Sequence, residues 1–286
     1  MLMNMKNLLA VANANYFAVP AFNTSSSMIL RGIIEACEEK QSPVIIAIHP
    51  DELSFVRDSF VKAVIEEAHK ATVPVCIHLD HGSSIDQVME AIQSGFTSVM
   101  IDASTQSLED NISICSKVVE LAHTVDVSVE GELGTIGTTG PEAEAGAEEI
   151  IYTNPADAVA FVEATGVDAL AIAIGTSHGI YPKDKKPELE LELLKVIKSR
   201  VNVPLVLHGG SANKDSEIAE SVKLGINKIN ISSDIKDAFY KKCREVLANP
   251  VLREPNSIYP PCIDAMKEVA YQKIALFNAE GKAKLY

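Results

Sequence analysis

The chain has 286 residues, a length that one α/β barrel can fill, and apolar residues make up 47% of it, enough for a large core. Its net charge of −14 predicts a surface that repels nucleic acid and anionic membranes, so we expect neither as a partner. The 5 cysteines form no CxxC pair, a usage typical of a reducing compartment. The first residues make a poor signal peptide and no apolar run is long enough to span a bilayer, so we expect a cytoplasmic protein.

Strand-like apolar runs recur along the whole chain and indicate the fold class. They lie at Phe17–Phe22, Val44–Ile48, Val73–Leu79, Ser98–Ile101, Asp126–Glu132, Val167–Ile174, Val203–Leu207 and Asn227–Ile231. Helical patterns separate them, and strand alternating with helix is typical of parallel βαβ units. Eight such units, spaced by roughly 30 residues, predict an α/β fold of the closed (β/α)8 TIM-barrel type. A doubly wound open sheet is the alternative, although such sheets usually have fewer strands.

Capping residues mark several helices between these strands. An apolar stripe runs along Ser26–Lys40. Later helices have N-cap residues or closing glycines at Ser84, Gly95, Ser107, Asn154, Gly166 and Gly225. In addition, Ser84 and Gln87 have the spacing of a capping box.

Two segments interrupt the alternation. Gly134–Thr153 is long, acidic and rich in glycine, and such a loop at the catalytic end of a barrel is often a lid, although a solvated acidic excursion is equally compatible with it. Asn249–Pro261 contains 4 prolines and precedes a final helical segment, Cys262–Phe277. We therefore expect a single barrel domain over residues 1–286, with 249–286 as a C-terminal helical extension that caps the barrel or packs on another subunit.

The run Val73–His81 ends in two residues that are costly to bury, Asp80 and His81. Alternation places Asp80 on the same face as Cys76 and His78, so His81 would point toward the helices if the strand continued. We therefore expect the chain to turn just after Asp80 and to present both side chains to a crevice at the carboxyl end of the strand.

Further costly residues gather at the carboxyl ends of the predicted strands. Together with the first two they are Asp80, His81, Asp102, Glu130, Glu132, His178 and His208. Because a barrel brings these strand ends to one mouth, we expect three imidazoles and several carboxylates to lie close together there. Such a set predicts a catalytic zinc site with an open coordination position. His78 is expected to pack below this layer and His49 to line the pocket, whereas His69 and His123 lie near helix ends and should be solvated.

Candidate anion-binding residues lie at and after the ends of the last two predicted strands, where such barrels usually bind phosphate. They are Gly209, Gly210 and Ser211, then Asn230, Ile231, Ser232 and Ser233, with Gly179 beside His178 as a further amide. Backbone N–H groups at such positions approach an anion closely. An acidic protein can therefore bind a phosphate without an arginine cluster.

These motifs resemble those of the class II, zinc-dependent ketose-bisphosphate aldolases, the fructose- and tagatose-bisphosphate aldolase family. The resemblance runs from AVPAFN, which begins at Ala18, through HLDHG, SVMIDAS, SVEGELG, GTSHG, LHGGS and INKINISSDIK to DAMKEV at Asp264–Val269. It implies zinc as the cofactor, with a monovalent cation such as Na⁺ or K⁺ as a further option. It also implies a small phosphorylated sugar as substrate and a homo-oligomer, either a dimer or a tetramer.

The resemblance assigns roles residue by residue. It implies that zinc is bound by His81, His178 and His208, and that Asp102 and Glu132 approach the metal or a second cation. It implies that Asp80 is the acid/base and that Asn23 lines the substrate pocket. The phosphate next to the ketone would be held by Gly179, Gly209–Ser211 and Asn230–Ser233. Cleavage of a ketose between C3 and C4 leaves an enediolate, whose charge zinc stabilises as a Lewis acid. Asp80 would take the C4 hydroxyl proton during cleavage and return it during condensation. Glu142, or else Glu144, would protonate the enediolate carbon, and no lysine Schiff base is required.

The chain departs from the family pattern at the end of the pocket away from the phosphate residues. No arginine stands in Tyr259–Ile263, where bisphosphate members have one for the distal phosphate, and Arg253 is an upstream substitute that aligns poorly. His49 stands where the family has a small hydroxyl residue. We therefore expect the substrate to keep its C1 phosphate and to differ at its distal end, as a ketose 1-phosphate or a longer acidic sugar would.

Three hypotheses for the function follow. The first is a zinc aldolase that releases dihydroxyacetone phosphate from a ketose like fructose or tagatose 1,6-bisphosphate, or from another ketose 1-phosphate. The second is a metal-dependent sugar-phosphate isomerase or epimerase on the same barrel, which would not make two products. The third is a non-catalytic phosphosugar-binding protein, although binding alone does not need the buried carboxylate of Asp80.

Overall fold

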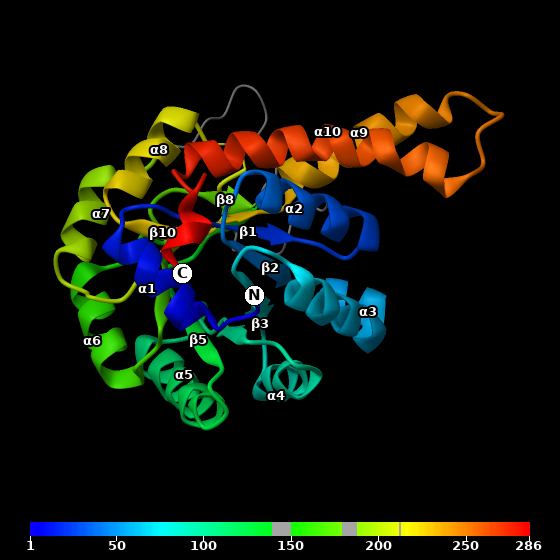
Figure 1. Ribbon diagram of the computed structural model, residues 1–286. Helices are drawn as coiled ribbons and strands as arrows, with labels where there is room; N and C mark the ends of the chain where they lie inside the picture. The colour runs from blue at the N-terminus through cyan, green and yellow to red at the C-terminus, as the bar shows by residue number, and fades with distance from the viewer. Residues whose placement is uncertain (139–149, 179–187, 212) are drawn as a thin grey trace.

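A closed parallel barrel forms the centre of the molecule (Figure 1). The computed structural model describes residues 1–138, 150–178, 188–211 and 213–286. The barrel strands are β1 (Val19–Asn23), β2 (Val44–Ile48), β3 (Val75–Gly82), β4 (Ser98–Ile101), β5 (Ser128–Leu133), β7 (Ala169–Ile172), β9 (Leu205–Leu207) and β10 (Ile226–Ile231). The sheet closes where β1 pairs with β10. The eight predicted strands are therefore all present, and the (β/α)8 fold is confirmed.

Helices surround the barrel on its outer side, except for the first helix, which lies at one end (Figure 1). They are α1 (Met5–Ala14), α2 (Ser27–Glu39), α3 (Pro50–Lys70), α4 (Ile85–Ser94), α5 (Leu108–His123), α6 (Pro155–Thr165), α7 (Leu191–Lys198), α8 (Asp215–Lys223), α9 (Ser233–Leu247) and α10 (Pro255–Leu276), followed by a short 3-10 turn, Lys282–Leu285. Among the described residues, no helix is long and apolar enough to cross a bilayer.

The predicted caps form, with one change. The Ser84 hydroxyl accepts from the Gln87 amide at 3.2 Å, and Gly95 ends α4 in the left-handed conformation. The Gln87 side chain, however, accepts from the Ser83 amide at 2.9 Å, so the reciprocal half of the box involves the residue before the cap. Residues such as these determine where each helix starts after its strand.

Helix α1 lies across the amino end of the barrel (Figure 1), and the sequence analysis did not predict it. Its signal was present, because Met5, Leu8, Leu9 and Ala12 follow helical spacing and all are buried. The Asn4 side chain caps the helix by accepting from the Asn7 amide at 3.0 Å. This helix closes the end of the barrel opposite to the carboxyl ends of the strands.

Helices α9 and α10 form a hairpin whose connecting turn projects away from the barrel (Figure 1). Helix α10 begins at Pro255, seven residues earlier than the predicted segment, and runs through Pro260 and Pro261. Pro255 suits the start, because a proline in the first helical turn lacks only an N–H that would have no partner anyway. The later part of α10 packs on α2, where a Cβ on Gly32 would lie 2.9 Å from Met266 Sδ. Helix α10 therefore packs on the side wall of its own barrel, and the residues after it reach the amino end, where the Tyr286 hydroxyl donates to the Leu8 carbonyl at 2.7 Å.

Two short strands outside the barrel were not predicted. They are β6 (Gly137–Thr138) and β8 (Ser177–His178), and they pair in parallel. This pairing joins the loop after β5 to the segment that contains His178. Residues 139–149 of the predicted lid lie outside the described residues.

Candidate active site

The backbone of β3 changes direction at His81, as the sequence predicts. His81 has a φ of 56°, and the pairing with β4 shifts register between Leu79 and Gly82. This bulge directs the His81 ring toward the mouth, where its centroid lies 4.5 Å from that of His208. A left-handed residue with a side chain costs about 1–2 kcal/mol, which the surrounding barrel must offset.

Three predicted imidazoles converge at this mouth. The His81 ring centroid lies 5.2 Å from that of His178, and the His178 and His208 centroids are 6.2 Å apart. One nitrogen of each of the three residues lies within 4.8 Å of the others. Three imidazoles at this spacing fit a divalent metal that prefers nitrogen ligands, keeps one position open and displaces any proton from the ligating nitrogens.

Asp102 fixes the orientation of His81. Its Oδ2 lies 2.9 Å from His81 Nδ1, while its Oδ1 accepts from the Ser104 amide at 3.0 Å and hydroxyl at 2.7 Å. Because Nδ1 donates to the carboxylate, Nε2 is the His81 nitrogen that faces the other imidazoles. Burial alone would lower the pKa of His81, but the Asp80 charge and the hydrogen bond to Asp102 raise that pKa to about 10.

Glu132 lies on the Nδ1 side of His81, with its Oε2 3.8 Å from that nitrogen. This oxygen is buried and accepts no hydrogen bond within the described part of the chain. Burial and the Asp102 charge raise the pKa of Glu132 well above its ordinary value. One ligand atom each of His81, Asp102 and Glu132 lies within 4.8 Å of the others, so these residues form a second group able to hold a cation.

Asp80 is fully buried and held by two asparagines. The Asn23 amide donates to Oδ2 at 2.8 Å, and the Asn230 amide donates to Oδ1 at 2.9 Å. Burial alone would raise the pKa of Asp80, but the nearby His81 and Lys228 charges lower it well below its ordinary value. Asp80 is therefore an ionised carboxylate that can accept a proton.

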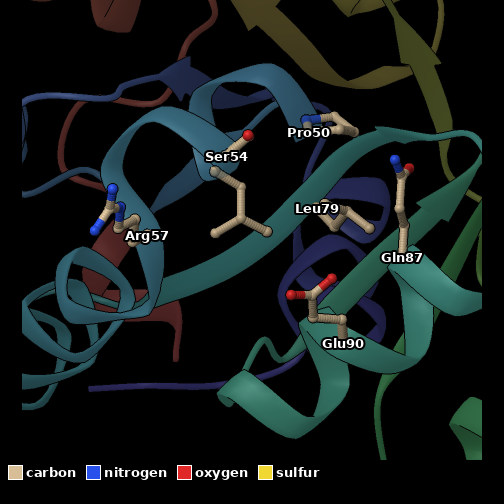
Figure 2. Close-up of a pocket in the computed structure, with 7 residues that line it drawn as sticks. Pro50, Ser54, Arg57, Leu79, Gln87 and Glu90 are labelled. Carbon is tan, nitrogen blue, oxygen red and sulfur yellow. The ribbon is translucent and has the colours of Figure 1, made fainter.

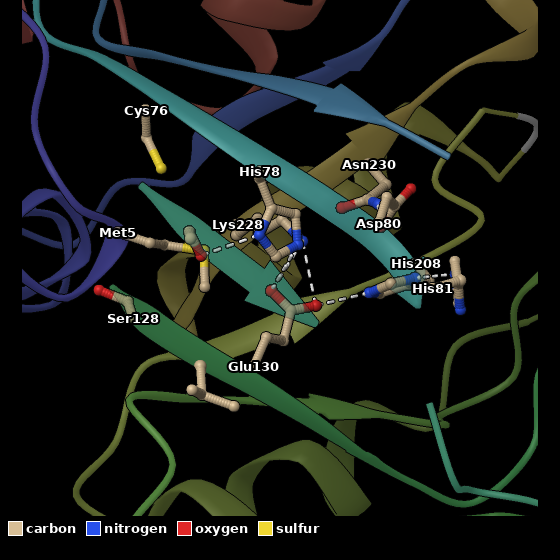
Figure 3. Close-up of polar contacts among 12 residues, drawn as sticks. Met5, Cys76, His78, Asp80, His81, Ser128, Glu130, His208, Lys228 and Asn230 are labelled. Carbon is tan, nitrogen blue, oxygen red and sulfur yellow. Dashed lines mark hydrogen bonds and ion pairs between the residues drawn. The ribbon is translucent and has the colours of Figure 1, made fainter. Parts of the chain in front are cut away.

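A charged layer lies directly below the imidazoles (Figure 3). Glu130, Lys228 and His78 are all 0% exposed there, which confirms that His78 packs beneath the mouth. The sequence analysis did not single out Lys228 or assign a role to Glu130. Strand alternation from Asn230 gave the signal, because residues two apart on a strand share one face and Lys228 must then point inward.

The loops after β9 and β10 have the features of an anion site. Gly209 has a φ of 67°, and a Cβ there would lie 2.6 Å from the Ser177 carbonyl oxygen, so only glycine allows this close approach. Helix α9 begins at Ser233, and its N-cap Ser232 leaves the first helical amides without a side-chain cap. The sequence analysis missed Lys236, whose Nζ donates to the Ser232 hydroxyl at 2.9 Å.

Other predicted residues fall at the edge of the site or outside it. His49 caps α3, accepts from the Asp51 amide at 3.2 Å, and lies with its ring 6.2 Å from that of His81. Arg253 is exposed in the turn of the projecting hairpin, so it does not line the site of its own subunit (Figure 1). Glu142, Glu144 and Gly179 lie outside the described residues.

The two histidines expected to be solvated, His69 and His123, are both exposed. His123 also has a partner that the sequence analysis did not predict, because its Nε2 lies 2.8 Å from the buried carboxylate of Asp168 near the amino end of the barrel. That partner comes from a residue that is distant in sequence.

A cavity of about 350 Å³ opens between α3 and α4 (Figure 2). It is lined by Pro50, Leu53, Ser54, Arg57, Leu79, Gln87 and Glu90. Leu79 points to the opposite side of β3 from Asp80, because successive strand residues alternate. This cavity therefore lies outside the barrel wall and is separate from the imidazole group.

Comparison with known proteins settles the family. A family model described as fructose-bisphosphate aldolase class-II matches residues 3–282. The chain belongs to this family. A fructose-bisphosphate aldolase of Thermus caldophilus is 37% identical, and the match covers 99% of this chain and 100% of that relative. The GatY subunit of D-tagatose-1,6-bisphosphate aldolase from Klebsiella oxytoca is 36% identical over 98% of this chain and 99% of its own.

A solved structure agrees with this assignment. The YdjI aldolase of Escherichia coli K12 matches with a TM-score of 0.86 at 34% identity, covering 99% of this chain and 100% of that one. The protein is thus a class II aldolase, a carbon–carbon lyase that acts on phosphorylated ketoses. The predicted family and activity are confirmed.

Proposed function

We propose that this aldolase depends on zinc and that His81, His178 and His208 hold the metal. The observation that carries the proposal is the convergence of three imidazoles, one nitrogen from each lying within 4.8 Å of the others, at the carboxyl end of the barrel. Zinc bound there would supply a Lewis acid for the ketose carbonyl.

Asp80 is the acid/base in this proposal. Its ionised carboxylate takes the proton of the C4 hydroxyl as the C3–C4 bond breaks, so that C4 leaves as an aldehyde. The electron pair of that bond stays with the three-carbon fragment, which becomes dihydroxyacetone phosphate once C3 is protonated. Glu142 is the proposed donor of that proton. In the reverse direction Asp80 returns its proton to the new hydroxyl.

The walls of the pocket suit a hydroxylated, phosphorylated ligand. The Oδ1 atoms of Asn23 and Asn230 are buried and have no hydrogen-bond partner within the described residues, so both can accept from sugar hydroxyls. Gly209 and the first turn of α9 offer backbone amides to the C1 phosphate. Lys236 lies beside them, but its Nζ already pairs with the Glu52 carboxylate at 2.6 Å as well as with the Ser232 hydroxyl.

We further infer that the distal end of the substrate is not the phosphate of a fructose-like bisphosphate. Arg253 stands in the projecting turn, and His49 lies at the pocket edge in the position of a small hydroxyl residue. A ketose 1-phosphate or a longer acidic sugar fits these two features better.

The test is release of dihydroxyacetone phosphate from fructose 1-phosphate and from fructose and tagatose 1,6-bisphosphates. Zinc-loaded protein should release it, a chelator should stop the release, and added zinc should restore it. We expect kcat/KM for the 1-phosphate to exceed that for the bisphosphates by about 10-fold or more. His49→Ser, which keeps a helix-capping oxygen, should reduce the ratio of kcat/KM for the 1-phosphate to kcat/KM for the bisphosphates.

The outcomes separate the parts of the proposal. Preference for a bisphosphate would refute the distal inference and leave the metal site standing. Release that a chelator does not affect would refute the metal role. Conversion of one ketose into another without release of dihydroxyacetone phosphate would favour the isomerase alternative.

We also infer a homo-oligomer and a cytoplasmic location. The projecting hairpin supports the first, because it exposes Tyr240, Leu247 and Val251 by 46%, 50% and 71%. The five cysteines, all free, support the second.

A further inference from the structure

Two opposite charges lie sealed inside the barrel below the imidazole group. Lys228 on β10 and Glu130 on β5 are both 0% exposed, and Lys228 Nζ lies 2.7 Å from Glu130 Oε2 and 3.0 Å from Oε1. A buried ion pair is weak evidence for stability, because the desolvation of both charges offsets most of their attraction. The contacts that the pair makes with other residues indicate a role beyond stability.

Every hydrogen of the Lys228 ammonium group has an acceptor. Two point to the Glu130 oxygens, and the third points to His78 Nε2 at 3.3 Å. His78 can accept there because its Nδ1 lies 2.9 Å from the Ser98 hydroxyl and donates to it. All the ammonium hydrogens of Lys228 and both ring nitrogens of His78 thus have hydrogen-bond partners when Glu130 is ionised. An ionised carboxylate can only accept hydrogen bonds.

The same carboxylate also contacts a predicted metal ligand (Figure 3). Glu130 Oε1 lies 2.8 Å from His208 Nε2. Since the carboxylate has no hydrogen to give, the hydrogen of this bond belongs to His208 Nε2. A neutral imidazole with its hydrogen on Nε2 has its lone pair on Nδ1, and Nδ1 faces His81 Nε2 at 2.8 Å. The lone pair of His208 is therefore directed at the metal group.

The facing imidazoles of His81 and His208 each donate a hydrogen bond to a carboxylate. His81 donates from Nδ1 to Asp102 and turns Nε2 inward, while His208 donates from Nε2 to Glu130 and turns Nδ1 inward. A carboxylate behind a ligating histidine fixes both the ring angle and the position of its hydrogen. We propose that Glu130, paired with Lys228, is a positioning residue that holds His208 in its Nε2–H form and so presents Nδ1 to the metal. This inference rests on the metal site of the proposed function.

The test uses the double variant Glu130→Gln, Lys228→Met, which removes the buried pair without leaving a lone charge. A glutamine amide offers either an oxygen or an N–H to His208, so it no longer dictates which nitrogen carries the hydrogen. In metal-free protein, the ¹⁵N signals of the His208 ring should report the Nε2–H form in the wild type and a mixture in the variant. The zinc Kd, measured by chelator competition, should weaken by about 10–100-fold.

The control removes an ion pair of similar length elsewhere, in which the glutamate is 52% exposed. Glu39→Gln, Lys267→Met breaks a 2.6 Å pair between α2 and α10 and should change neither measurement. If the double variant at the site does not fold, Glu130→Asp takes its place, because it keeps the charge and shortens the reach to His208. An unchanged ring signal and a zinc Kd within twofold of wild type would overturn the inference. A wild-type protein that fails to bind zinc would instead overturn the proposed function.

Discussion

Asp80→Ala is expected to retain its zinc and to lose aldol cleavage by about 10²–10⁴-fold in kcat, the usual contribution of a general acid or base. The variant keeps all three imidazoles, so the metal group stays assembled, while the C4 hydroxyl loses its proton acceptor. Zinc content per chain and the rate of dihydroxyacetone phosphate release from the same preparation check this result.

Asp168→Ala is the matched control for this variant. Asp168 is also a buried carboxylate with hydrogen-bond partners, since it accepts from the Val129 amide at 2.9 Å, but it lies near the amino end of the barrel. Both changes leave donors without an acceptor and should lower stability to a similar extent. Only Asp80→Ala should lower kcat. Full activity in Asp80→Ala would show that another group accepts the proton.

His208→Ala should lose both zinc and turnover. Its removal takes away one of three nitrogen ligands, and we expect zinc binding to weaken by more than about 100-fold, since loss of a mere supporting contact costs 10–100-fold. Activity should then follow the amount of bound metal and recover in part at high zinc concentration. Equilibrium dialysis against zinc, followed by assay, measures both quantities.

His123→Ala tests whether a loss of zinc and turnover in His208→Ala comes from the metal site or from general destabilisation of the fold. Like His208, His123 bonds a buried carboxylate at 2.8 Å, in this case that of Asp168. It should leave zinc content and kcat unchanged. Retention of stoichiometric zinc by His208→Ala, at wild-type affinity, would remove His208 from the proposed ligand set.

Strand ends could be predicted from sequence because their information is local. The runs that precede Asp80, His178 and His208 are apolar, and each is followed by residues that a core does not accept alone, so the barrel mouth and its imidazoles followed from pattern and fold rules. The change of direction at His81 followed from alternation in the same way. The structure places all three imidazoles together as expected.

Partners across the barrel could not be predicted in this way. Lys228 and Glu130 lie on strands that are not neighbours, and the sequence around either residue does not indicate the other as its partner. The same holds for His123 and Asp168, which come from different βα units. The pairing of Ser177–His178 with the loop after β5 also depends on tertiary structure, because a two-residue strand has no periodicity to detect.

The left-handed backbone of His81 would link the proposed metal to the folding equilibrium. An unfolded chain seldom adopts that conformation at residue 81, and its three imidazoles are scattered, so the ligand set exists only in the folded barrel. A ligand that binds only the folded state raises the free energy of unfolding by about 2.7 kcal/mol at 100 times its Kd. Zinc availability would then set how long the protein survives proteolysis, and metal starvation would reduce its abundance as well as its rate.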